Sequence, residues 1–223
     1  MQRNINYSET FGVSVVLSSI AISSPFTRTK ILHDNELNPF AYAIGYGCNY
    51  NSSVIIGGTD EEDEISSYIL IKFAQDICKA CETGKTIMGI DVTKALSNKG
   101  IWIIPSYNAC KEKAKAKNLI VNKIYPTKML ELTSCENGIK YNLGKNAITN
   151  KRLLTFLLSS SRGADIENSE PLPDDSLANW FSKTVSKPAF RMGIGKSDEQ
   201  SMMSGADIIY RKLIEFFLLF IIS

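Results

Sequence analysis

Histidine is nearly absent from this 223-residue chain, which contains only His33. Any mechanism that needs an imidazole base would have to use this one residue. No nucleophile-elbow pattern accompanies it, and its surroundings indicate a solvent-exposed loop with Asp34 beside it. We therefore expect no catalytic residue from this composition.

Cysteine is present in an odd number, five, with no regular framework. That number favours free thiols in a reducing, intracellular compartment over a disulfide scaffold. Cys78 and Cys81 have CxxC spacing, which also occurs in redox pairs and half zinc sites. No second CxxC or His pair exists, so we expect core thiols, no metal site and no cofactor.

Other signatures are missing as well. Gly84-Lys85-Thr86 and Gly195-Lys196-Ser197 resemble the end of a phosphate-binding loop, but Lys79 and Phe190 stand where the motif needs its first glycine. We find no internal repeat, which disfavours solenoids. No secretory signal is indicated near the N-terminus. The apolar run in residues 213–223 is far shorter than the roughly 20 residues that cross a bilayer.

Charge is sorted into blocks along the chain. Residues 1–93 have a net charge of -5, residues 94–152 of +9 and residues 153–223 of -2. A near-neutral total of +2 therefore conceals a basic middle segment. Such a segment is typical of a surface that meets phosphate or another anion.

The basic segment gives the candidate binding residues. Eleven of its twelve basic residues are lysine, which favours sequence-independent phosphate contact, with tyrosines available to stack on bases. A plain solvated surface is the alternative. The predicted nucleic-acid contacts are Lys111, Lys113, Lys115, Lys117, Lys123, Lys128, Lys140, Lys145, Lys151, Arg152, Tyr107 and Tyr125.

In the N-terminal portion, residues 13–22 predict a strand, with a helix as the alternative, and residues 54–56 predict a short strand. Residues 35–53 predict mostly loop with at most one short strand. Thr59 and Glu62 have capping-box spacing, and Ile69, Phe73 and Ile77 then recur on one face. We therefore expect a helix over 60–82. Short apolar runs predict further strands at 86–91 and 101–104.

In the middle, Ser106 precedes a predicted helix over 107–117, and residues 119–125 predict a strand. Two alternating runs, 129–133 and 139–143, flank a turn signal and predict a hairpin. Beyond residue 146 the signals are helical, at 153–158, around Trp180 and from Ser197 to the end. The last of these helices is apolar on every side, so we expect it to be buried.

These elements predict an α+β fold, with a mixed N-terminal portion of short strands and two helices followed by a helical C-terminal portion. The expected division is 1–145, an α+β domain with the basic segment, and 146–223, a helical region; one continuous domain is the alternative.

The combination predicts a non-enzymatic, self-assembling protein of the cytoplasm that binds single-stranded nucleic acid without sequence preference, as a nucleocapsid or coat protein does. The terminal helix would join subunits into a homo-oligomer. One alternative is a matrix-like scaffold on an anionic membrane surface, which would use the same lysines and the apolar helix. A small enzyme with an unrecognised site is the other.

Overall fold

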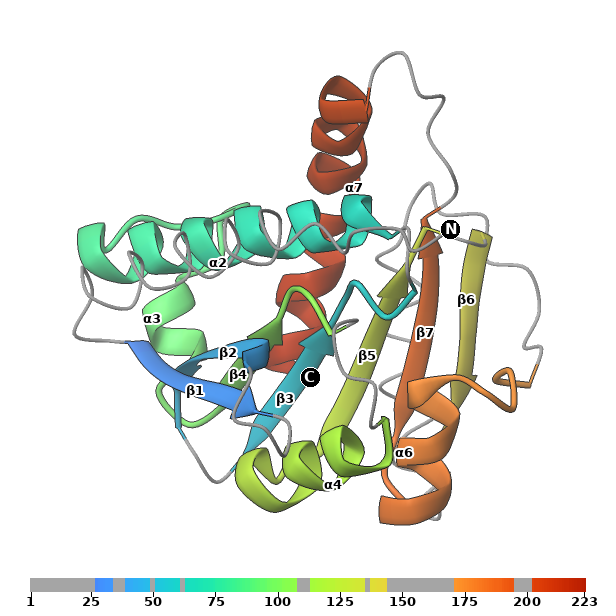
Figure 1. Cartoon of the computed structure of the whole chain (residues 1–223). Coiled ribbons are helices and arrows are strands. Elements are labelled where there is room, and N and C mark those ends of the chain that lie inside the picture. Colours follow the sequence, from blue (N-terminus) through green and yellow to red (C-terminus); the bar gives the residue numbers. More distant parts are fainter. Residues whose placement is uncertain are drawn as a thin grey trace.

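Seven strands form one mixed sheet, in the order β1-β2-β4-β3-β5-β7-β6 (Figure 1). The computed structural model describes residues 27–33, 39–48, 51–60, 63–107, 113–134, 137–143, 171–194 and 202–223. The strands are β1 (Thr27–His33), β2 (Pro39–Gly47), β3 (Ser52–Ile56), β4 (Gly100–Ile104), β5 (Lys128–Thr133), β6 (Asn137–Asn142) and β7 (Ala189–Ile194). Strands β4, β3, β5 and β7 are parallel, while β1, β2 and β6 add antiparallel pairings at the two sides.

The central strands are apolar on both faces. Along β3, Val54 and Ile56 face one side while Ile55 faces the other, and all three are fully buried. Trp102 and Ile103 of β4 divide between the faces in the same way. This burial on both faces is why β3 and β4 are continuous apolar runs in the sequence, as parallel strands covered by helices usually are.

Helices cover both faces and make three layers. One face packs against α2 (Glu64–Thr83), the short α3 (Val92–Ala95) and α7 (Met202–Ile222). The other face packs against α4 (Lys113–Ile124) and α6 (Leu177–Val185). Figure 1 shows α4 and α6 in front of the sheet and α7 behind it.

Helix α2 confirms the predicted helix, with a different start. Asp63, not Thr59, is the N-cap, and its carboxylate accepts the Ser66 N–H at 3.2 Å. The predicted stripe is buried on the sheet, including Ile69 and Phe73. The expected core position of the CxxC thiols is confirmed, because both cysteines are free and buried.

Three local predictions were wrong. Residues 39–47, expected within a loop, form the nine-residue strand β2. Residues 86–91 form no strand and contribute only an isolated bridge between Ile87 and Ile90. Residues 119–124 belong to α4 rather than to a strand, because Ile120 and Ile124 lie one helical turn apart and are both buried against the sheet.

The predicted hairpin was also wrong. Its two strands form as β5 and β6, but β7 lies between them and pairs with both. The mixture of helices and strands confirms the α+β class in its broad sense. The helical C-terminal layout is only partly correct, because strand β7 comes from the portion that was expected to be helical. The proposed division at residue 145 stays a prediction. The strand expected at 13–22 and the helix at 153–158 lie outside the described residues.

The terminal helix α7 is buried in its own chain. Phe217 packs on Phe73 of α2 with ring centroids 5.0 Å apart, and Phe220 meets Phe190 of β7 at 5.8 Å. Both α7 rings are fully buried. The expectation that this helix joins subunits is therefore wrong, because the sheet and α2 already cover most of its apolar side chains from residue 206 onward. Among the described residues, no helix is long and apolar enough to cross a membrane.

Candidate functional site

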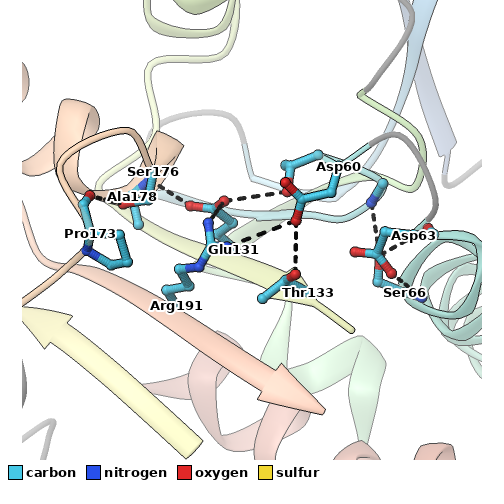
Figure 2. Close-up of polar contacts among 11 residues, drawn as sticks. Asp60, Asp63, Ser66, Glu131, Thr133, Pro173, Ser176, Ala178 and Arg191 are labelled. Carbon is cyan, nitrogen blue, oxygen red and sulfur yellow. Dashed lines mark hydrogen bonds and ion pairs between the residues drawn. The ribbon is translucent and has the colours of Figure 1, made fainter. Parts of the chain in front are cut away.

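The carboxyl ends of the parallel strands gather several ionic groups, among them Glu131, the most deeply buried charged residue of the described part of the chain. Strands β3, β5 and β7 run in the same direction, so their carboxyl ends meet at one edge of the sheet (Figure 1). Asp60 follows β3, Thr133 ends β5 with Glu131 two residues before it, and Arg191 lies in β7. We define these four residues as the carboxyl-edge cluster (Figure 2).

Glu131 and Arg191 form the centre of the cluster. They lie directly opposite each other in the parallel pairing of β5 with β7. Arg191 Nη1 donates to Glu131 Oε1 at 2.5 Å. The Glu131 side chain is 1% exposed and that of Arg191 is 12% exposed, so the ion pair is almost wholly removed from water. Truncating one partner of such a pair would leave an unpaired buried charge.

Two further donors satisfy Glu131. The N–H of Ala178, in the first turn of α6, donates to Oε2 at 2.8 Å, and the Thr59 hydroxyl donates to Oε1 at 3.3 Å. Burial raises the pKa of the Glu131 carboxyl, while Arg191 and the Ala178 N–H oppose that shift. Glu131 thus joins β5, β7, α6 and the segment before α2.

Asp60 is the part of the cluster that reaches water. Its Oδ2 accepts from the Thr133 hydroxyl at 2.9 Å and lies 3.8 Å from Arg191 Nη2. Its side chain is 40% exposed. The cluster therefore has a buried ion pair beneath a half-exposed carboxylate.

The backbone holds Asp60 in place through a glycine turn. Gly58 has φ +59°, and a Cβ there would lie 2.6 Å from Ser67 Oγ. Its N–H donates to Ser66 Oγ at 2.8 Å, which fixes the turn on the first residues of α2. Only glycine combines this left-handed conformation with such close approach.

The position of the cluster is one at which α/β sheets usually bind ligands. The helices that follow the neighbouring strands β3 and β4 cover opposite faces, α2 on one and α4 on the other. In α/β sheets, a switch of this kind marks the place where ligands usually bind, outside the carboxyl ends of the strands. The carboxyl-edge cluster is therefore the candidate site.

The predicted basic contacts are distributed differently. Lys113, Lys115, Lys117 and Lys123 belong to α4, where Lys117 Nζ lies 5.4 Å from the centre of the Trp180 ring. Lys140 is in β6 and half-buried. Lys111, Lys145, Lys151 and Arg152 lie outside the described residues.

The remaining three predicted contacts do not share one exposed surface. Lys128 and Tyr107 are buried, at 8% and 5% exposure, whereas Tyr125 is 69% exposed. In this conformation no base can stack on Tyr107, because sheet and helix side chains surround its ring.

Sequence reasoning missed the residues of the cluster. Arg191 was the signal that could have indicated them, since it stands alone within an apolar run, Ala189 to Ile194. A lone arginine in a buried strand requires a carboxylate partner. Nothing in the local sequence identifies that partner as Glu131, sixty residues earlier.

The architecture resembles metallo-peptidases. A metallo-carboxypeptidase from Burkholderia cenocepacia superposes with TM-score 0.66 and 10% identity, covering 93% of this chain and 67% of that structure. A Pseudomonas aeruginosa metallo-carboxypeptidase has TM-score 0.62 and 9% identity, covering 92% and 67%. The LapA aminopeptidase of Legionella pneumophila has TM-score 0.65 and 10% identity, covering 99% and 66%.

No family model and no curated protein matches this chain by sequence. Identities this low establish a shared fold, and the chain spans about two thirds of these structures.

This fold overturns the function predicted from the charge pattern. The structures that the chain resembles over most of its length are peptidases, so the nucleocapsid- or coat-like nucleic-acid-binding protein was the wrong expectation. The partners predicted with it, nucleic acid, a homo-oligomer through the terminal helix and a membrane surface, are withdrawn for the same reason.

The metal that such a fold implies does not fit the residues of this chain. Carboxypeptidase A binds its zinc through two histidines and one glutamate. This chain has one histidine, and His33 lies in edge strand β1, separated from β5 by three strands, or about 19 Å at the usual strand spacing. Within the described part of the chain, no three His, Cys, Asp or Glu side chains could together hold a metal ion.

Proposed function

We propose that this protein binds peptides, or ligands with similar amino and carboxyl groups, at the carboxyl-edge cluster without hydrolysing them through zinc. The observation that carries the proposal is the likeness to metallo-carboxypeptidases over 93% of the chain. The position of the cluster supports it, because ligands of such sheets bind outside the carboxyl ends of the strands. A donor set with one histidine supports the absence of zinc-dependent hydrolysis.

The cluster has groups that suit a peptide. Asp60 presents a half-exposed carboxylate to an amine or an amide N–H, and the buried Thr133 hydroxyl donates to that carboxylate from below. The Pseudomonas neighbour was solved with (2-guanidinoethylmercapto)succinic acid, whose name describes a guanidino group and two carboxyl groups. A ligand with charged groups of both signs is therefore the class to test first. An intracellular location is part of the proposal, and the free thiols of Cys48, Cys78 and Cys81 support it.

Peptide binding is tested by isothermal titration with a peptide library, comparing the native protein with Asp60→Asn. Asp207→Asn is a matched control, because its side chain is 41% exposed, close to the 40% of Asp60, and is also ion-paired, with Lys72. We expect Asp60→Asn to weaken peptide binding and Asp207→Asn to leave it unchanged. Equal affinities for all three proteins would contradict the proposed site.

Hydrolysis is tested on the same peptides by mass spectrometry, with and without added zinc. We expect intact peptides in both conditions. Zinc-dependent release of C-terminal residues would show that the protein is a metallo-carboxypeptidase in activity as well as in fold.

A further inference from the structure

Arg191 occupies a position from which it reaches both carboxylates of the cluster. Its guanidinium donates to Glu131 at 2.5 Å and lies 3.8 Å from Asp60. Guanidinium stays protonated at every pH at which proteins fold, so this positive charge is permanent. Its planar fork also fixes the direction of each contact.

Three of the carboxylate oxygens around Arg191 already have donors. Glu131 Oε1 accepts from Arg191 and Thr59, Glu131 Oε2 accepts from the Ala178 N–H, and Asp60 Oδ2 accepts from Thr133. A divalent cation here would have to displace these donors and would be repelled by a guanidinium a few ångströms away. The same contacts connect strands β5 and β7 with the segment before α2 and with the first turn of α6, and Arg191 lies at their centre.

We infer that Arg191 is the positioning residue that organises this site in place of a metal ion, so that ligand binding at the site requires no metal. This inference deepens the proposed peptide-binding function and rests on it for the ligand. It assigns to a protein side chain a task that a bound cation could otherwise perform: a fixed positive charge that holds the surrounding oxygens.

The first test is metal dependence in the full-length protein. We expect sub-stoichiometric zinc, manganese and iron by elemental analysis, and the same peptide affinity and melting temperature before and after dialysis against EDTA. One equivalent of bound metal, or peptide binding lost to EDTA and restored by zinc, would overturn the inference.

The second test removes the arginine. Arg191→Met leaves the buried Glu131 carboxyl without its cationic partner, so we expect the melting temperature to fall by about 10 °C and peptide affinity to weaken at least about tenfold. The double variant Glu131→Gln/Arg191→Met removes both charges and keeps an oxygen for the Ala178 N–H. It should recover part of the melting temperature but not the affinity, because Asp60 has still lost Arg191.

Lys72→Met is the matched control. It breaks an ion pair of similar length, Lys72 with Asp207 at 2.5 Å, at the α2–α7 contact away from the cluster. We expect it to leave peptide affinity unchanged. Unchanged affinity and stability in Arg191→Met would overturn the inference.

The two proposals fail differently. If no peptide binds even to the native protein, the proposed function fails. In that case the role of Arg191 is still decided by two measurements: the metal content of the native protein, and the melting temperature of Arg191→Met compared with that of the double variant.

Discussion

The two ends of strand β5 bury charges of opposite sign by different means. At the carboxyl end, Glu131 is matched by the guanidinium of Arg191 and by a backbone N–H. At the amino end, Lys128 contacts the Ser223 hydroxyl at 2.9 Å and lies 4.9 Å from the centre of the Phe220 ring. A hydroxyl and an aromatic ring solvate an ammonium group less well than a carboxylate does.

The pKa of Lys128 reflects its weaker set of partners. Burial, together with the neighbouring Lys99, lowers the pKa of Lys128 to about 7. Lys128 can therefore avoid the cost of a buried charge by losing its proton near neutral pH, whereas Arg191 cannot lose its proton. A buried group that stays charged, such as Arg191, needs a partner of opposite charge. A buried group that can lose its proton, such as Lys128, needs only neighbours that accommodate both the charged and the neutral form.

The largest effect is expected from breaking the carboxyl-end pair on its acidic side. Glu131→Leu removes the partner of Arg191 and the acceptor of the Ala178 N–H, so the free energy of unfolding should fall by about 3–5 kcal/mol. Urea unfolding at pH 7 of Glu131→Leu and the native protein measures this difference in the free energy of unfolding. The control is Asp174→Asn, which removes an exposed carboxylate and should not change the free energy of unfolding measurably. If Glu131→Leu lowers the free energy of unfolding no more than this control does, the ion pair of Glu131 with Arg191 contributes little to stability.

The amino end should respond to pH instead. The pKa of Lys128 is about 7 in the folded protein, against an ordinary lysine value of 10.5 in the unfolded chain. The unfolded chain therefore binds more protons between these values, and stability rises with pH across that window. Lys128→Met removes this dependence and should stabilise the protein at pH 6 by about 1–3 kcal/mol, after the loss of the Ser223 and Phe220 contacts.

Urea unfolding at several pH values from 6 to about 10 tests this, with Lys183→Met, an exposed lysine, as control. If the slope between pH 7 and about 10 is the same in Lys128→Met and the native protein, the assignment of the pH dependence to Lys128 is wrong.

A smaller effect sharpens the role of the ring. Phe220→Leu keeps an apolar side chain in the core but removes the aromatic face near Lys128, and should cost about 1–2 kcal/mol. The cost should be greater at pH 6, where Lys128 is charged, than near pH 9. A cost independent of pH would show that only packing against Phe190 is lost.

No difference in unfolding midpoint is expected between the two portions of the chain. Strand β7 pairs with both β5 and β6, so we expect one cooperative unit rather than two domains. Calorimetry and urea unfolding followed by circular dichroism should give a single transition. Two separated transitions would support a domain boundary near residue 145.

Local sequence signals were sufficient to predict several of the elements. The apolar face that includes Ile69, Phe73 and Ile77 predicted α2, short apolar runs predicted β3 and β4, and the helical signal around Trp180 predicted α6. The all-round apolar character of the terminal helix predicted its burial, since no other environment accepts such a surface in a globular chain.

The way in which those elements meet depends on the folded chain as a whole. An alternating run has the same pattern whether it pairs with its neighbour in the chain or with β7, so β5 and β6 were expected to pair directly. The charge blocks gave no information on the site, because its ionic groups come from three separated segments. Glu131 and Arg191 became a pair only when β7 was placed beside β5, since burial and pairing over sixty residues depend on topology and leave no local pattern.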